Sequence, residues 1–300
     1  GDVLSYNTSA VRLLDVHPED DRPQSVLAFN RSPDFRDAVD SALTGTASER
    51  ITKLAGRSYS LIANPVTNNN GVQGAVIVLL DVTEKEENER LRREFTANVS
   101  HELKTPLTSI MGYAEIIEAG IAKPTDVVPF AGKIRTEAQR LLSLIEDIIR
   151  LSQLDAGGEE IPFEPIELQP LCCTVRSRLQ SKADRLGLKI ECAGENATVS
   201  GQRRTLEQMV FNLADNALAY NRPNGSVTIE TGTDSDGAPF VRVSDTGIGI
   251  APADQKRVFE RFYRVDKSHS KMTGGTGLGL SIVKHGAALH GAALTLDSTL

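Results

Sequence analysis

The stretch FTANVSHELKTPL, residues 95–107, places a histidine and a proline within one helical pattern. From Leu103 onward, apolar residues recur at alternating spacings of four and three, which predicts a helix with one apolar seam. At about 100° per residue, His101 lies far from Leu103 around this helix, so its imidazole is expected to face solvent. Pro106 lacks the N–H that an internal helical position uses, at a cost of about 3 kcal/mol. A helix that keeps such a proline one turn from an exposed histidine suggests a function for both.

A second helix with its own seam follows. Between the two, the sequence KPTD, residues 123–126, ends one helix and begins the next. Two helices alone bury too little apolar surface, so we expect two chains to pair into a four-helix bundle through residues 87–155. The alternative is that the seams pack against flanking domains. The seam positions are Leu103, Leu107, Ile110, Ala114, Ile117 and Ile121 in the first helix, and Ile134, Ala138, Leu141, Ile145 and Ile148 in the second.

The sequence on either side of the hairpin differs in pattern. Residues 1–86 mix short apolar runs with turn signals and end in a β-rich run, which predicts a small α+β domain. Beyond a break at residues 155–160, alternating helix and strand signals predict an α/β sandwich. The elements predicted there are helices near 168–186 and 203–220, strands at 188–192 and 293–296, and a hairpin around 234–237.

Composition excludes several classes of protein. The 300 residues include 33 Lys+Arg against 40 Asp+Glu, an acidic balance that argues against nucleic-acid binding. The longest clean apolar run, Ala75–Leu80, is far shorter than the roughly 20 residues of a membrane span. Since the chain begins at Gly1 rather than Met, we expect a fragment: the cytoplasmic portion of a protein anchored only through upstream segments absent from this chain. The three cysteines have no metal-ligand spacing and indicate a reducing compartment.

Three elements in the last domain predict a nucleotide site. Asn212 and Asn216 lie four residues apart in a helical run and share a face, and amide oxygens suit Mg²⁺. Asp245 ends a predicted strand and opens DTGIG, residues 245–249, which offers one fixed acceptor and room for a planar ring. GTGLGL, residues 275–280, opens an apolar helix, where backbone N–H groups can bind phosphates. Each element alone is weak evidence, and there is no P-loop sequence.

The string around His101 resembles the phospho-acceptor box of the bacterial sensor histidine kinases of two-component systems, in their PhoR/VicK-like group. The three elements of the last domain resemble the N, G1 and G2 boxes of the GHKL-type ATP-binding fold, and residues 259–264 resemble the F box. Residues 1–86 resemble a PAS domain through their exit, Asp81-Val82-Thr83. The resemblance implies a multidomain protein: a PAS-like sensor domain at 1–86, a HisKA-type dimerisation and phosphotransfer hairpin at 87–155, and an α/β-sandwich catalytic domain at 159–300, whose last turn and strand we expect to be missing.

The resemblance also implies a reaction. ATP with Mg²⁺ would phosphorylate His101, and the phosphoryl group would pass to a receiver-domain aspartate of a cognate response regulator. Glu102 would act as base or orienter, and Thr105 would orient a water for dephosphorylating that regulator. Asn216 would bind Mg²⁺, Asn212 the metal–phosphate end, and Asp245 the adenine amino group. The implied nucleotide-binding residues are Asn212, Asn216, Tyr220, Asp245, Gly247, Gly249, Phe259, Phe262, Gly275, Thr276, Gly277, Leu278, Gly279 and Leu280.

Two features leave alternatives open. Ala219 stands before Tyr220 where the family usually has Lys, so one phosphate contact would have to come from Arg222 or from a lysine of the lid. The expected lid includes Asp266, Lys267, Ser268, Lys271 and Thr273. A catalytically weak signalling scaffold with a nucleotide-gated conformation remains one alternative. A general ATPase clamp is another, although it leaves the string around His101 without a function.

Residues 1–86 contain no cysteine, which excludes flavin-adduct light sensing, and His17 is a poor haem ligand.

Overall fold

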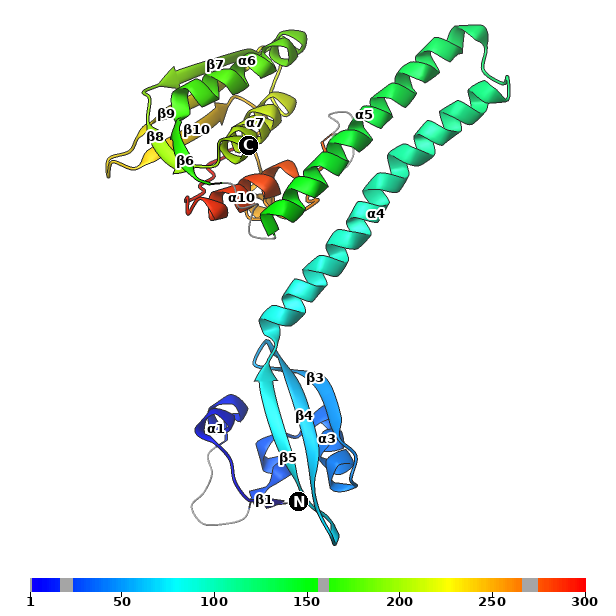
Figure 1. The fold of residues 1–300 in the computed structure, drawn as a ribbon, viewed down its shortest axis with the longest axis vertical. Coiled ribbons are helices and arrows are strands. Elements are labelled where there is room, and N and C mark those ends of the chain that lie inside the picture. Colours follow the sequence, from blue (N-terminus) through cyan, green and yellow to red (C-terminus); the bar gives the residue numbers. More distant parts are fainter. Residues whose placement is uncertain (1, 17–23, 156–161, 266–274) are drawn as a thin grey trace. The chain divides into compact units, whose positions relative to one another are not determined.

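The computed structural model describes residues 2–16, 24–155, 162–265 and 275–300. It divides into two compact units, residues 1–96 and residues 97–300 (Figure 1). The predicted lid at 266–274, the break at 156–161 and His17 lie outside the described residues. Within the described ranges, no helix combines the length and the apolar character needed to cross a membrane.

The first unit is an antiparallel sheet packed against one helix. The sheet has the order β3-β4-β5, and its inner face meets α3 through Phe35 and Leu61, both buried. α3 begins behind Ser32, whose Oγ accepts a hydrogen bond from the Phe35 N–H at 3.3 Å. The predicted α+β character of this region is therefore present. Its elements are β1 (Asp2–Val3), α1 (Thr8–Leu14), β2 (Gln24–Ser25), α2 (Val26–Phe29), α3 (Pro33–Leu43), β3 (Ser48–Leu54), β4 (Arg57–Asn68) and β5 (Gly71–Asp81).

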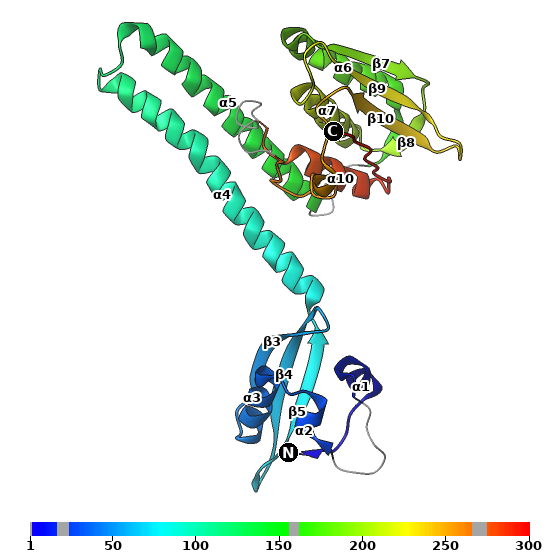
Figure 2. The same ribbon diagram turned by 180° about the vertical axis from the view of Figure 1, so that it is seen from behind.

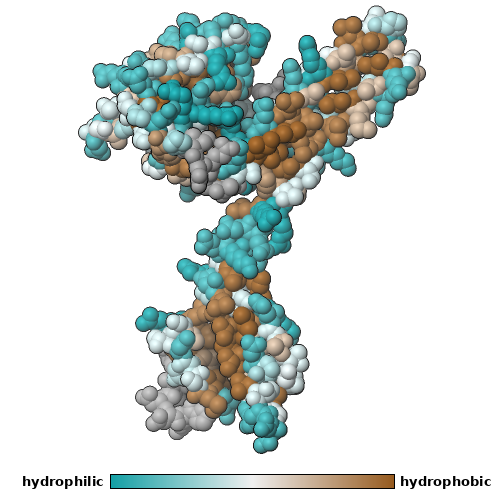
Figure 3. Space-filling view, in the orientation of Figure 1, coloured by the Kyte–Doolittle hydropathy of each residue, from teal (hydrophilic) through white to brown (hydrophobic). Residues whose placement is uncertain are grey.

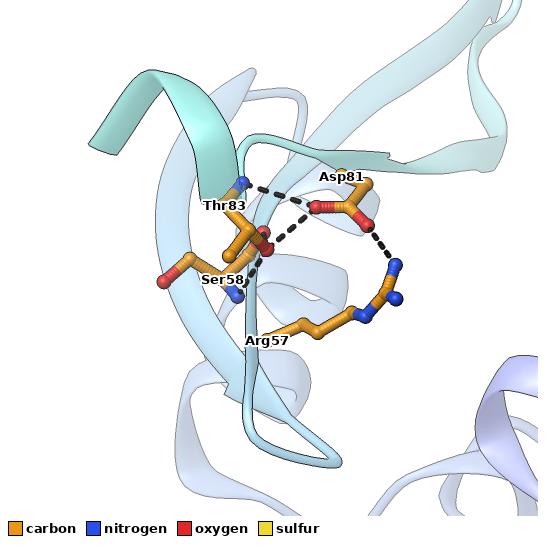
Figure 4. Close-up of polar contacts among 4 residues, drawn as sticks. All are labelled: Arg57, Ser58, Asp81 and Thr83. Carbon is orange, nitrogen blue, oxygen red and sulfur yellow. Dashed lines mark hydrogen bonds and ion pairs between the residues drawn. The ribbon is translucent and has the colours of Figure 1, made fainter. Parts of the chain in front are cut away.

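A polar network joins the end of β5 to the start of the following helix, α4 (Thr83–Glu118) (Figure 4). Asp81 Oδ1 accepts from the N–H of Thr83 at 3.0 Å and from its hydroxyl at 2.6 Å. Arg57 Nη1 donates to Asp81 Oδ2 at 3.0 Å, and the Ser58 N–H donates to Thr83 Oγ1 at 3.0 Å. The hydrogen bonds from Thr83, then the hydrogen bond from Arg57, lower the pKa of Asp81. The carboxylate thus ties β4, β5 and the first turn of α4 together.

The predicted hairpin consists of α4 and α5 (Pro124–Asp155). α4 ends at Glu118, and just beyond it Gly120, with φ +66°, and Ile121 donate backbone hydrogen bonds to the last turn of the helix. α5 begins at Pro124, where a missing N–H costs nothing, as KPTD predicted. Much of the apolar seam is open in the single chain: apolar side chains gather along both helices in Figure 3, and Leu107, Ile121 and Ile145 are 49%, 74% and 43% exposed.

The remaining elements form an α/β sandwich. The main sheet has the order β10-β9-β7, with β7 parallel to β9, and a second pair, β6-β8, lies beside it. Helices α6 and α7 lie on one face of the main sheet, as Figures 1 and 2 show from opposite sides, and bury Val175, Val210 and Ile229. The elements are β6 (Glu164–Glu167), α6 (Leu168–Leu186), β7 (Lys189–Gly194), β8 (Thr198–Gly201), α7 (Arg203–Ala219), β9 (Ser226–Thr233), β10 (Pro239–Asp245), α8 (Pro252–Gln255) and α10 (Gly279–Leu289).

The strand predicted at residues 293–296 is wrong, since the chain from residue 292 to residue 300 forms neither helix nor strand. A strand requires a ladder of backbone hydrogen bonds to a neighbour. Here Ser298 bonds across to the segment after β10 instead. Its Oγ accepts from the Ile250 N–H at 2.9 Å, and its carbonyl accepts from Gln255 Nε2 at 3.0 Å.

Candidate functional site

His101 lies exposed on α4, as its position in the helical pattern predicted. Thr105 follows one turn later on the same exposed face, and its hydroxyl donates to the His101 carbonyl at 3.2 Å. Pro106, inside the helix, is buried. An exposed neutral imidazole is a competent nucleophile, so this helix presents reactive chemistry to whatever docks on it.

Glu102 lies between two guanidinium groups. Its Oε2 is 3.7 Å from Arg140 Nη2, on α5, and 3.9 Å from Nη1 of Arg264, the last residue of the expected F box. The side chains of Arg140 and Arg264 are only 19% and 11% exposed, so these ion pairs are screened less than surface pairs. The carboxylate expected to assist His101 is thus held by cations from the hairpin and from the ATP-binding fold.

The N-box amide of Asn212 joins α7 to the start of α10. Asn212 is 8% exposed, its Nδ2 donates to the Gly279 carbonyl at 3.1 Å, and its Oδ1 accepts from Gln208 Nε2 at 2.8 Å. Asn216 lies one turn further along α7 and is partly buried. The sequence prediction that the two amides share a helix face therefore holds. Their hard oxygen donors fit Mg²⁺, and Asn216 is the one whose amide we expect to hold it.

The G1 loop packs onto the end of α7. Asp245, exposed at the end of β10, accepts from the Gly247 N–H through Oδ1 at 2.8 Å. The Ile248 N–H donates to the carbonyl of Tyr220 at 3.1 Å. A Cβ on Gly247 would lie 2.6 Å from both Asp245 Oδ1 and the Tyr220 carbonyl oxygen, and one on Gly249 (φ +76°) would overlap the Thr299 carbonyl. Both positions therefore need glycine, and the N-box helix and the G1 loop form one surface.

The F box and the G2 box are joined by a backbone hydrogen bond. The Phe262 N–H donates to the Gly277 carbonyl at 2.9 Å, and both residues have left-handed backbones, with φ +61° and φ +73°. For phenylalanine this conformation is strained, and such strain concentrates at functional sites. Phe259 is partly buried nearby in sequence, Leu278 is fully buried, and Leu280 lies partly buried in α10. Sequence reasoning gave no signal for the strained Phe262.

Gly277→Ala is expected to destabilise this domain. A Cβ at this position would lie 3.0 Å from Phe262 Cα while φ is +73°, so the variant should lose roughly 1–3 kcal/mol. Thermal unfolding followed by circular dichroism should show a Tm lower by several degrees. Gly275→Ala is the matched control, since its Cβ would meet nothing closer than the Tyr220 hydroxyl at 3.9 Å. Equal Tm values for the two variants would contradict the geometry.

The hairpin helix α5 also reaches this site. Asp147 Oδ2 accepts from the hydroxyl of Thr276, in the G2 box, at 2.7 Å. Burial raises the pKa of Asp147, against the opposing effects of the Thr276 hydrogen bond and the charge of Arg150. Arg150 Nη1 donates to Gln208 Oε1 at 3.0 Å, and Gln208 in turn binds Asn212. Two polar paths therefore run from α5 to the expected phosphate loop. The sequence analysis missed both.

Asp147→Asn is expected to tighten ATP binding. The wild-type carboxylate places a negative charge beside the Thr276 hydroxyl, which is expected to face the nucleotide phosphates, and the amide keeps its shape without its charge. The ATP Kd should fall by about 3- to 10-fold, on the order of 1 kcal/mol. Calorimetry measures it, and Glu146→Gln, at an exposed neighbouring position, should change little. The difference between Asp147→Asn and wild type should shrink as pH falls towards the raised pKa of Asp147, because protonation removes the same charge. An unchanged or higher Kd contradicts this reading.

Two family models match the chain. Residues 91–157, which include His101, match the His Kinase A (phospho-acceptor) domain. Residues 201–300 match the histidine kinase-, DNA gyrase B-, and HSP90-like ATPase. This second match includes α7, the G1 loop and the start of α10, which the structure brings together.

Relatives match over longer stretches. The sensor-like histidine kinase SenX3 of Mycolicibacterium smegmatis is 39% identical over 251 residues, which are 79% of this chain and 65% of SenX3. The phosphate regulon sensor protein PhoR of Pseudomonas aeruginosa is 32% identical over 303 residues, 99% of this chain and 67% of PhoR. Among solved structures, the Acinetobacter baumannii histidine kinase AdeS aligns with a TM-score of 0.52 and 26% identity over 63% of this chain and 86% of that one. This chain thus spans less than two thirds of SenX3 and about two thirds of PhoR.

Proposed function

Because this chain belongs to the bacterial sensor histidine kinases of two-component systems, we propose that it transfers the γ-phosphoryl group of ATP to His101. One observation carries the proposal: the chain combines an exposed histidine on the phospho-acceptor helix with a candidate nucleotide site. In that site, Asn212, Asp245 and the G2 box lie on α7, β10 and the start of α10, and α7 packs against both β10 and α10. The general ATPase clamp and the weak scaffold leave the exposed His101 without a role.

In the proposed reaction, a ring nitrogen of His101 attacks the γ-phosphorus in line with the departing ADP oxygen. The new P–N bond forms as the bond to ADP breaks, and the ring proton passes to a base. Glu102 is the adjacent carboxylate; its ion pairs to Arg140 and Arg264 both involve Oε2, so Oε1 is the oxygen that would take that proton. Asp245 orients the adenine, and the backbone N–H groups at the start of α10 stabilise the phosphates. Asn216 would hold Mg²⁺, which would supply neutralisation of the phosphate charge.

We propose further that the phosphoryl group passes to a receiver-domain aspartate of a response regulator docked on the hairpin. Thr105, which follows His101 by one turn on the same exposed face, would orient a water for dephosphorylating that regulator. The open seam supports a homodimer through residues 87–155, because Leu107, Ile121 and Ile145 are left exposed in the single chain.

For the first unit we propose a PAS-like sensor or relay domain. Its support is the exit from β5, where Asp81 binds both Arg57 and Thr83 (Figure 4). A shift of β4 or β5 therefore alters the start of α4 directly.

The test of the proposed function is incubation with γ-labelled ATP and Mg²⁺, with ATP binding measured separately. A phosphohistidine gives label that is labile in acid and stable in base. An ATPase clamp would release labelled phosphate without labelling the chain, and a scaffold would bind ATP with neither result.

A further inference from the structure

Two cysteine thiols meet on the edge of the ATP-binding fold. Cys173, in the second turn of α6, and Cys192, in β7, have their Sγ atoms 2.9 Å apart. Cys173 is exposed and Cys192 is partly buried, whereas the neighbouring Cys172 is fully buried in the core. The pair thus differs from Cys172 in having both a partner and access to solvent.

The approach of the two sulfurs is set by packed elements. α6 packs along β7, and Arg176, three residues after Cys173, donates through Nε to the Ile190 carbonyl at 3.2 Å. This bond holds the helix to the strand two residues before Cys192. A disulfide bond is about 2.05 Å long, so closing it requires the sulfurs to move together by only about 0.9 Å.

We propose that Cys173 and Cys192 form a reversible intramolecular disulfide when the protein meets a hydroperoxide, which makes the pair a redox modification site of this domain. Nothing in the phosphotransfer reaction uses either thiol. The proposal therefore stands independently of the proposed kinase activity.

The reaction takes two steps. With hydrogen peroxide, the thiolate of Cys173 attacks one oxygen, the O–O bond breaks, and the released hydroxide takes up the thiol proton and leaves as water, so that Cys173 becomes a sulfenic acid. The sulfur of Cys192 then attacks the Cys173 sulfur; the S–S bond forms, the S–O bond breaks, and the hydroxide leaves as a second water with the Cys192 proton. Two electrons pass from the thiols to the peroxide. Burial, and then the contact with Cys173, raise the pKa of Cys192 to about 12, which leaves the exposed Cys173 to react first.

The bridge is expected to act on stability rather than on nucleotide binding. None of the candidate nucleotide residues lies in α6 or β7; they come from α7 and the residue that follows it, the end of β10 and the segments after it, and the start of α10. Cys173 and Cys192 are 19 positions apart, so linking them closes a short loop, which restricts the unfolded chain. The oxidised domain should therefore unfold at a Tm higher by on the order of 5–10 °C.

The test uses the whole reduced chain treated with hydrogen peroxide. Intact mass should fall by about 2 Da, since two hydrogens leave as the bridge forms, and dithiothreitol should reverse the change. Peptide mapping should recover the linked peptides. Cys173→Ser and Cys192→Ser should each abolish the link, whereas Cys172→Ala, the neighbouring-thiol control, should keep it.

Several results would overturn the proposal. These are separate oxidation of Cys173 with a mass gain of about 16 Da, a link to Cys172 or to another molecule, or a pair that stays reduced while Cys173 reacts with an alkylating reagent. A calorimetric scan of the oxidised and reduced wild type supplies a readout that needs no variant. Equal Tm values for the oxidised and reduced forms would contradict the expected stabilisation of the domain by the disulfide.

Discussion

His101→Gln is expected to reduce label transfer from γ-labelled ATP to background. Glutamine has a polar side chain of related size, but its amide nitrogen is not a nucleophile, so no phosphorus–nitrogen bond can form. Because His101 is exposed on α4, the substitution should change stability by no more than about 0.5 kcal/mol. Label is scored on a gel after acid and base treatment, and ATP affinity is measured by calorimetry, where the Kd should stay within about twofold of wild type.

The control for this experiment is Thr108→Ala, an exposed position two turns further along the same helix. It should retain label at close to the wild-type amount. Label that persists on His101→Gln at the wild-type level would place the acceptor elsewhere. A wild type that binds ATP without any label would favour the scaffold alternative, with Ala219 as the first position to restore to Lys.

Asp245→Ala is expected to weaken ATP binding by roughly 10- to 100-fold. A hydrogen bond from the adenine amino group to an ionised carboxylate contributes about 1.5–3 kcal/mol, and its loss converts to that range of affinity. The carboxylate lies at the end of β10, where the Gly247 N–H holds Oδ1 in a fixed orientation. Calorimetry with ATP gives the Kd, and label on His101 at saturating ATP should recover much of its wild-type level.

Asp236→Ala provides the matched control, because this exposed carboxylate belongs to the turn between β9 and β10 rather than to the G1 loop. Its ATP Kd should equal that of wild type. A similar Kd for Asp245→Ala and Asp236→Ala would mean that Asp245 does not contact the base. A loss of folding in Asp245→Ala, seen as a lower Tm, would instead show that the carboxylate supports the loop.

Local sequence patterns predicted much of this fold. α6 runs from Leu168 to Leu186, as its periodicity indicated, and α7 ends one residue before the predicted limit. The turn at 234–237 was predictable because an aspartate side chain readily accepts hydrogen bonds from nearby backbone N–H groups. Here Asp234 Oδ1 accepts from the N–H groups of Asp236 and Ala238. Such signals lie within a few residues of the structures they specify.

Contacts between distant residues were not predictable in this way. Asp147 and Thr276 are 129 residues apart in the sequence. A polar residue on α5 does not by itself indicate which distant residue it will bind. The left-handed Phe262 is similar: no local preference of phenylalanine favours φ +61°, and the conformation depends on the bond to Gly277. The partners of Glu102 were not predictable for the same reason, since its carboxylate meets Arg140 and Arg264 from distant parts of the chain.

The path from Arg150 through Gln208 and Asn212 to the Gly279 carbonyl has a thermodynamic consequence. When one contact affects a ligand site, the ligand affects that contact by the same factor. If α5 holds the phosphate loop in a form that binds ATP less tightly, then ATP must loosen α5 by an equal amount. A movement of the hairpin would therefore change the apparent affinity of the nucleotide site for ATP. In return, a fall in cellular ATP would restore the contact between α5 and the phosphate loop.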